Sequence, residues 1–192
     1  MTAQQIIISG VGGQGILFIT RLLAETAILL GLPVLTSETH GMAQRGGIVI
    51  SHLKIGDFSS PLIRPGQANG LLSLKQETVQ LHRHFLRPGG WSVANSSYTE
   101  TAQFTVDADQ QALKLGNPQA VNLIVLGCAL AGPGLLFCSR EQVEATIRVR
   151  LAAKPGLLTG ALAALSAGAD NLYTERGLIT RCSDDDRSFD GC

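Results

Sequence analysis

The stretch GVGGQG has the composition and spacing of a phosphate-binding turn. It carries the pattern G-x-G-x-x-G between an apolar run at residues 5–9 and a helix-like run at 16–30. Glycines at these places allow a tight turn and a close approach of a ligand, and the first N–H groups of the following helix then face open space. The same glycines could instead serve close packing alone. The candidate ligand-binding residues are Gly10, Gly12, Gly13, Gln14 and Gly15.

A second glycine-rich stretch, SETHGMAQRGG at residues 37–47, carries polar side chains suited to a charged ligand. Arg45 could hold a carboxylate or phosphate in a two-pronged contact, or it could form an exposed ion pair with Glu38. His40 could move protons near neutral pH, although a lone loop histidine more often makes hydrogen bonds or interface contacts. The candidate binding residues here are Glu38, Gln44, Arg45 and Gly46, and the candidate catalytic residue is His40.

Glu38 keeps a nicotinamide-dependent enzyme open as an alternative. A dinucleotide site needs an acid at the end of the second strand to hold the ribose hydroxyls, and Glu38 follows the glycine turn at an acceptable spacing. No later segment offers a convincing catalytic acid, base and substrate pocket. A non-catalytic nucleotide-binding or assembly module is a further alternative.

The sequence predicts no metal site. The four cysteines form no C-x-x-C pair, whereas iron–sulfur clusters and structural zinc usually need ligands close together in the sequence. We interpret Cys128 and Cys138 as small core residues. His82 and His84 stand two apart on an expected helix and so face different ways, and His52 is expected to be structural.

Composition indicates a globular chain without a strong electrostatic field. Of its 192 residues 45% are hydrophobic and 16% are charged, and 15 basic residues balance 15 acidic ones, which disfavours nucleic acid as a partner. A basic head and a long apolar body of an export signal are missing, so we expect a cytoplasmic protein. The apolar stretch at 121–138 is interrupted by glycine and proline, and no membrane span is expected.

Hydrophobic periodicity and turn residues predict an alternation of strands and helices. The strand–helix–strand unit at the start should place its two strands parallel and adjacent, with the loop 37–47 beside the glycine turn. RPGG at 87–90 is predicted to be a turn. The expected strands are 5–9, 33–36, 48–55, 69–74, 91–95 and 103–106, and the expected helices are 16–30, 76–86, 118–131, 140–152 and 155–168.

These elements indicate an α/β fold, a Rossmann-like, mostly parallel sheet with flanking helices and a helical C-terminal part. Residues 1–173 are expected to form a single domain. Residues 174–192 are polar, with three consecutive aspartates, and are expected to form a flexible tail.

The two motif segments together resemble a known family. GVGGQGILFITRLLAETA followed by SETHGMAQRGGIVISHLKIG is similar to the gamma-type component of the 2-oxoacid:ferredoxin oxidoreductases, especially the beta subunits of the indolepyruvate ferredoxin oxidoreductases. The similarity continues more weakly through RPGGWSVAN and NLIVLGCAL and covers roughly residues 5–135.

The resemblance implies a subunit of a complex that decarboxylates a 2-oxoacid, transfers the acyl group to coenzyme A and reduces ferredoxin. It implies that thiamine diphosphate and the iron–sulfur clusters are held mainly by other subunits, which would be this chain's partners. The chain would complete the active site and could contact coenzyme A or a diphosphate through its glycine turn. Alone, it would be inactive and could form a homodimer.

Overall fold

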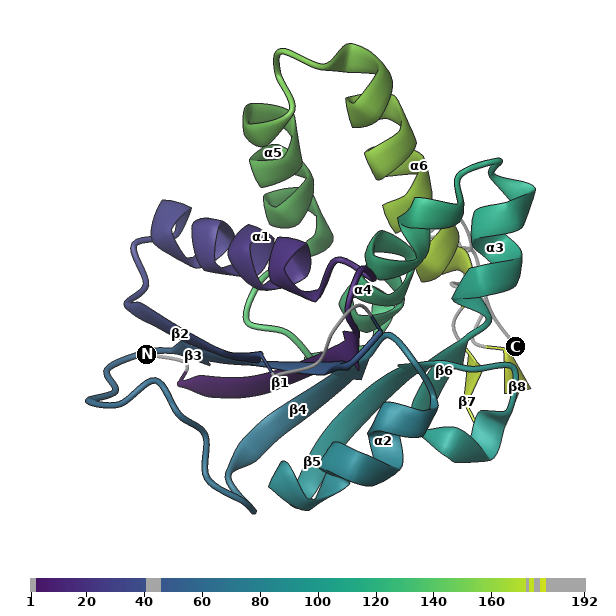
Figure 1. Cartoon of the computed structure of the whole chain (residues 1–192). Coiled ribbons are helices and arrows are strands. Elements are labelled where there is room, and N and C mark those ends of the chain that lie inside the picture. The colour runs from purple at the N-terminus through teal and green to yellow at the C-terminus, as the bar shows by residue number, and fades with distance from the viewer. Residues whose placement is uncertain (1–2, 41–45, 172, 175–176, 179–192) are drawn as a thin grey trace, which may run out of the picture.

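The computed structural model describes residues 3–40, 46–171, 173–174 and 177–178 (Figure 1). Its strands form one sheet in the order β2-β3-β1-β4-β5-β6-β7-β8. The strands are β1 (Gln4–Val11), β2 (Val34–His40), β3 (Ile48–Ile55), β4 (Ala68–Ser73), β5 (Leu86–Asn95), β6 (Phe104–Val106), β7 (Tyr173–Thr174) and β8 (Gly177–Leu178). The helices are α1 (Ile16–Leu29), α2 (Glu77–His82), α3 (Ala108–Lys114), α4 (Val121–Ala131), α5 (Arg140–Arg150) and α6 (Pro155–Asp170), with short 3-10 turns η1 (Arg83–Phe85), η2 (Thr99–Thr101) and η3 (Pro118–Ala120).

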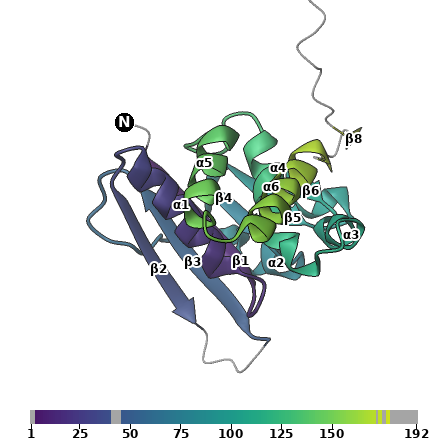
Figure 2. The ribbon, with the colours of Figure 1, turned by 90° about the horizontal axis from the view of Figure 1, so that it is seen from above.

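The prediction of an α/β fold with a mostly parallel sheet is confirmed. β1, β4, β5 and β6 are parallel neighbours, and β3 runs antiparallel to both β1 and β2. Seen from above, the larger helices lie together over one face of the sheet (Figure 2). Helix α2 lies on the opposite face (Figure 1).

The first strand unit differs from the prediction in one respect. β2 runs in the same direction as β1, but the two are not adjacent, because β3 folds back and pairs with both. Pairing with β3 also extends β2 to His40, so Glu38 lies opposite Ser51 on a strand rather than in a loop. The predicted loop is therefore shorter, and most of it, residues 41–45, lies outside the described residues.

Two other local predictions were wrong. The segment 87–90 belongs to β5, where the sheet register shifts between Ala68 and Gly70 and Gly89 adopts a φ of 72°. Its glycines therefore form an irregular strand rather than a turn between elements. Helix α3 was not expected. It begins at Asp107, whose carboxylate accepts a hydrogen bond from the N–H of Gln110.

The core lies mainly between the sheet and its larger helical layer. Ile6 and Ile8 of β1 face this layer, whereas Ile7 faces α2, and all three are fully buried. An unbroken apolar run is typical of a central strand covered on both faces. This apolar run is the reason that the sequence predicts β1. The buried strand also fixes the position of the glycine turn that follows it.

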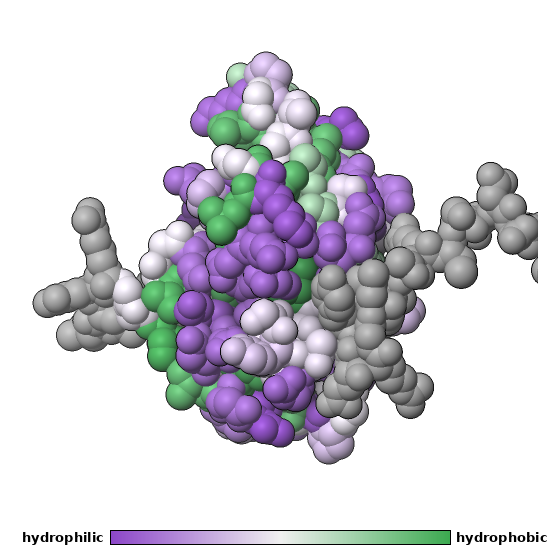
Figure 3. Space-filling model, turned by 90° about the vertical axis from the view of Figure 1, so that its right-hand side faces the viewer, coloured by the Kyte–Doolittle hydropathy of each residue, from purple (hydrophilic) through white to green (hydrophobic). Residues whose placement is uncertain are grey.

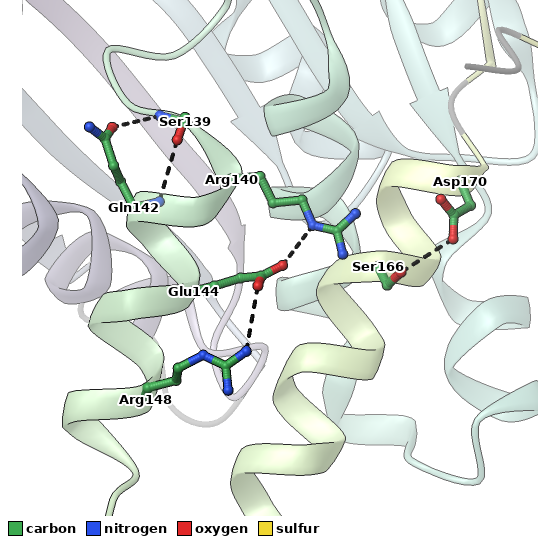
Figure 4. A network of polar contacts seen from close by, with 7 residues as sticks. All are labelled: Ser139, Arg140, Gln142, Glu144, Arg148, Ser166 and Asp170. Atoms are coloured by element: carbon green, nitrogen blue, oxygen red, sulfur yellow. Dashed lines mark hydrogen bonds and ion pairs between the residues drawn. The ribbon is translucent and has the colours of Figure 1, made fainter. Parts of the chain in front are cut away.

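The predicted capping box at the start of α5 is present. The Ser139 hydroxyl accepts a hydrogen bond from the N–H of Gln142, and the Gln142 side chain accepts one from the N–H of Ser139 (Figure 4). Farther along α5, Glu144 pairs with Arg140 at 2.7 Å and with Arg148 at 3.8 Å. These contacts fix the start of α5 and stabilise its outer face only modestly.

The side of the molecule that carries α3 is largely hydrophilic. In the space-filling view its visible apolar residues form small separate areas rather than one broad patch (Figure 3). Within the described residues, no helix combines the length and the apolar character needed to cross a membrane.

Two histidines lie on the face of the sheet that α2 covers, His52 buried on β3 and His82 half-buried at the end of α2. His52 is 5% exposed and its Nδ1 accepts a hydrogen bond from the N–H of Ile63, and His82 Nδ1 shares a hydrogen bond with Ser9 Oγ at 2.6 Å. Burial lowers the pKa of both imidazoles below their usual value of 6.5. The positive charge of Lys54 further lowers the pKa of His52. Both residues therefore favour the neutral form in the folded protein.

We expect the free energy of unfolding to fall as the pH drops below about 6.5, because the unfolded chain then binds more protons than the folded one. The loss should not exceed about 1.4 kcal/mol per pH unit for each histidine. Urea unfolding between about pH 7.5 and about pH 5.5 measures it. His82→Gln should flatten the profile, because it removes one of the two histidines whose pKa is lowered. A wild-type profile without slope in this range would contradict the assignment.

Candidate functional site

The end of the second glycine-rich segment, Gly46 and Gly47, lies beside the glycine turn, as predicted. The N–H of Gly12 donates a hydrogen bond to the carbonyl of Gly47 at 2.8 Å, directly beyond the last β1–β3 pair, Val11 and Ile48. Gly46 adopts a φ of 102°. Gln44 and Arg45 lie outside the described residues, and so does the His40 side chain, although the His40 backbone ends β2.

The glycines of the turn have different roles. A Cβ at Gly10 would lie 2.8 Å from Gln14 Oε1 and 3.0 Å from Leu74 Cβ, and a Cβ at Gly15 would overlap the Asn122 side chain. These two glycines permit close packing. Gly13 has a φ of 99° and nothing within 4 Å of its missing Cβ. Gly13 is thus the glycine at which the turn faces open space.

Gln14 holds the turn from within. Its Oε1 accepts a hydrogen bond from the N–H of Val11 at 2.8 Å, and its Nε2 donates one to the carbonyl of Leu74 at 3.0 Å. The side chain therefore joins the ends of β1 and β4. Gln14 was predicted as a ligand-binding residue, and the structure gives its side-chain amide internal partners.

We expect Gln14→Ala to lower the free energy of unfolding by about 1–3 kcal/mol, because the N–H of Val11 loses its side-chain acceptor and the carbonyl of Leu74 keeps only the longer bond from Asn95 Nδ2. Gln119→Ala is the matched control, since Gln119 is exposed on the same rim. Chemical denaturation of both variants measures the difference. Equal stability of the two variants would show that the Gln14 bridge contributes nothing.

Two pockets flank the glycine turn and share Gly13 and Gly15. One, of about 340 Å³, is mainly apolar and is lined by Gly12, Gly13, Gly15, Ile16, Leu17 and Val49. The other, of about 420 Å³, is more polar and is lined by Gly13, Gln14, Gly15, Asp109, Pro118, Gln119, Val121 and Asn122. Helix α1 begins between them at Ile16, so its first N–H groups and its positive dipole end lie at the junction of the pockets.

A third pocket adjoins the polar one at Asp109. It measures about 270 Å³ and lies beyond the ends of β4 and β5, lined by Lys75, Gln76, Glu77, Asn95, Ser96, Ser97, Tyr98, Asp107 and Asp109. Asn95 Nδ2 donates to Asp109 Oδ2 at 3.0 Å and so fixes the carboxylate between the two pockets. The carboxyl edge of the parallel strands is where open α/β sheets bind ligands.

Sequence reasoning missed Asn95, Asp109 and Asn122 as site residues. Each comes from a segment remote from the glycine turn, and only the order of the strands and the packing of α3 and α4 bring them to this edge. One usable signal was the position of Asn95 at the end of an expected strand, because such positions gather at the ligand-binding edge.

The position of Glu38 disfavours the nicotinamide alternative. A dinucleotide site places the ribose-binding acid on the strand next to the glycine turn. Here β3 lies between β1 and β2, and Glu38 does not line either pocket at the turn.

The described part of the chain contains no group of three or more histidine, cysteine or acidic side chains placed to hold a metal ion. Cys128 and Cys138 are buried, as predicted, and burial raises the pKa of both thiols to about 12. They are therefore neutral core residues. Cys182 and Cys192 lie outside the described residues.

Comparison with known proteins identifies the family. Residues 5–171 match the family "Pyruvate ferredoxin/flavodoxin oxidoreductase". The chain belongs to this family. The resemblance seen in the two glycine motifs is thus confirmed, and it extends over nearly the whole described fold.

Relatives of this oxidoreductase chain are subunits of larger enzymes. Indolepyruvate oxidoreductase subunit IorB of Archaeoglobus fulgidus is 32% identical over 174 residues, covering 78% of this chain and 86% of the relative. The subunit of the same name from Thermococcus kodakarensis is 28% identical over 181 residues, covering 80% and 89%.

Solved structures share the fold. The gamma subunit of a keto/oxoacid ferredoxin oxidoreductase from Geobacter sulfurreducens superposes with a TM-score of 0.73 at 24% identity, covering 88% of this chain and 95% of that one. The 2-oxoglutarate:ferredoxin oxidoreductase of Magnetococcus marinus, solved with 2-oxoglutarate, coenzyme A and succinyl-CoA, gives 0.71 at 20% identity, covering 88% of this chain and 30% of that one.

Proposed function

We propose that this chain is the gamma-type subunit of a cytoplasmic, thiamine diphosphate-dependent 2-oxoacid:ferredoxin oxidoreductase that oxidises indolepyruvate or another arylpyruvate to an acyl-CoA. The names of its relatives support the reaction class, and the indolepyruvate subunits among them support the substrate. The observation that carries the chain's own role is the hydrogen-bonded pair Gly12–Gly47 beside the glycine turn that two pockets share, at the carboxyl edge of the parallel strands.

This edge fits the diphosphate of coenzyme A. Gly13 leaves open space beside the start of α1, whose unpaired N–H groups can donate to phosphate oxygens. The apolar pocket beside Leu17 and Val49 would accept an uncharged part of the same molecule. Among the described residues the lining of these two pockets supplies no cationic side chain, so the backbone and the helix dipole would carry the electrostatic part of binding.

In the assembled enzyme, thiamine diphosphate would supply the decarboxylation chemistry and iron–sulfur clusters the path for electrons to ferredoxin, and we assign both to partner subunits. This chain's residues would position coenzyme A and keep water from the shared site. His40 at the end of β2, with Gln44 and Arg45 beyond it, stays a prediction for proton transfer and for contacts with the ligand or the partner.

A non-catalytic assembly module is the second candidate, and the Gly12–Gly47 contact is compatible with it. It requires that substitutions at the glycine edge, the carboxyl edge of the sheet formed by Gly12, Gly13 and Gly47, reduce assembly while turnover per assembled complex stays constant. The proposed function requires instead that some changes reduce turnover within complexes that still assemble.

Reconstitution tests the proposal. The full chain would be co-expressed with the thiamine-dependent and iron–sulfur subunits of the same host, and dye reduction by indolepyruvate and pyruvate would be measured with and without it. We expect a stable complex and coenzyme A-dependent reduction only when the chain is present. Recovery of the chain as a monomer, or undiminished activity in its absence, would overturn the proposal.

A further inference from the structure

The largest of the described pockets lies at the end of the sheet opposite the glycine edge. It measures about 440 Å³ and is lined by Gln5, Lys54, Phe58, Ser59, Ser60, Leu62, Arg64 and Gln67. Gln5 is the second residue of β1 and pairs with Lys54 near the end of β3, while the other residues come from the segment that joins β3 to β4. Figure 1 shows this segment at the left end of the sheet, away from the start of α1.

The lining has an unusual charge pattern. It contains two cations, two serine hydroxyls and two carboxamides, and it contains no carboxylate. Neither Lys54 nor Arg64 forms an ion pair or a side-chain hydrogen bond within the described part of the chain. Two like charges that face one pocket repel each other, and an anion between them would remove that repulsion.

Lys54 is the more informative of the two. It is only 7% exposed, and its ammonium lies 4.9 Å from the centre of the Phe58 ring. Burial, followed by the charge of Arg64, lowers the pKa of Lys54. Buried charges are normally paired, and a cation–π contact offsets only part of the desolvation cost. The ammonium of Lys54 therefore has N–H donors available for an anion.

Other groups around the pocket suit an oxyanion. The hydroxyls of Ser59 and Ser60 are exposed donors, and the Gln5 side-chain amide is anchored to the carbonyl of Gln67 at 3.2 Å. Phe58 and Leu62 supply an apolar wall. The volume exceeds that of inorganic phosphate alone, so the site has room for a small organic group attached to the anion.

We propose that Lys54 and Arg64, with Ser59 and Ser60, form a binding site for the phosphate group of a small phosphorylated molecule, separate from the glycine edge. The proposal does not depend on the oxidoreductase assignment, because it is drawn from residues at the other end of the sheet.

The test is a titration of the isolated full-length chain with inorganic phosphate, ribose 5-phosphate and, at matched ionic strength, sodium chloride, followed by amide NMR shifts. We expect phosphate-dependent shifts at Ser59, Ser60 and Gln67. Tighter binding of ribose 5-phosphate than of phosphate would identify a phosphomonoester as the ligand, and equal binding would identify the free anion. Either outcome supports the site.

Lys54→Met and Arg64→Gln should each weaken phosphate binding roughly ten-fold or more, the effect of losing one charge-assisted contact. Lys114→Met on α3 removes the same charge elsewhere and should leave binding unchanged. Lys54→Met should keep a cooperative thermal unfolding transition without phosphate, and this shows that the variant folds. No shift at Ser59 and Ser60, or unchanged binding by both site variants, would overturn the proposal.

Discussion

Gly168→Ala is expected to lower the free energy of unfolding by about 3 kcal/mol, the upper range for overpacking a well-filled core. An added Cβ at Gly168 would overlap the carbonyl oxygen of Ile124 on α4 and lie 3.0 Å from the N of Cys128. Both atoms belong to the backbone and cannot rotate away, so α4 and α6 would have to move apart. Gly127 makes the reciprocal approach to Leu165.

Urea unfolding of the full chain, followed by circular dichroism, measures this loss. Gly160→Ala is the matched control in the same helix, because its Cβ would meet only Asn117 Nδ2 at an ordinary 3.7 Å. It should raise stability by about 0.5–1 kcal/mol through helix propensity. A Gly168 variant as stable as the wild type would mean that α4 and α6 are less closely packed than described.

The second large effect is expected at the glycine turn. Gly13→Ala should lower kcat/KM for coenzyme A in the assembled enzyme by roughly ten-fold or more, equivalent to about 1.4 kcal/mol. The added methyl group enters the space between the two pockets, and the left-handed backbone at Gly13 strains any residue with a Cβ. The added methyl group would therefore block the space for the ligand, and the strained backbone would distort the turn.

Gly31→Ala separates strain from function. Gly31 has a φ of 71° and nothing within 4 Å of its missing Cβ, as at Gly13, but it follows the far end of α1. Both variants should lose similar stability, about 1–2 kcal/mol, while only Gly13→Ala loses coenzyme A-dependent turnover. Equal turnover in the two complexes would leave Gly13 with a structural role alone.

Local signals explain what the sequence could predict. The apolar run Ile6–Ile8 needs both faces covered, which makes β1 a central strand, and the Ser139–Gln142 capping box is complete within four residues. The glycine pattern likewise predicts a turn before α1. In each case the residues that decide the structure are close together in the chain.

The predictions that were wrong concern segments whose structure depends on pairing with residues far away in the sequence. Nothing within 33–36 indicates that β3 will insert between β2 and β1, because that order depends on the pairing of β3 with both strands. The site was predicted only in part for the same reason. Gly15 requires glycine because Asn122, from α4, packs against it, and Asp109 reaches the rim through a short helix whose composition is mostly polar.

Hydrogen–deuterium exchange of the isolated chain and of the assembled oxidoreductase tests whether the glycine turn holds coenzyme A. We expect amides of residues 13–17, at the turn and the start of α1, to exchange more slowly in the complex with coenzyme A than in the isolated chain. Peptides covering the exposed residues 152–154, between α5 and α6, serve as the internal reference. Unchanged exchange at 13–17 in a complex that turns over would contradict binding of coenzyme A at the glycine turn.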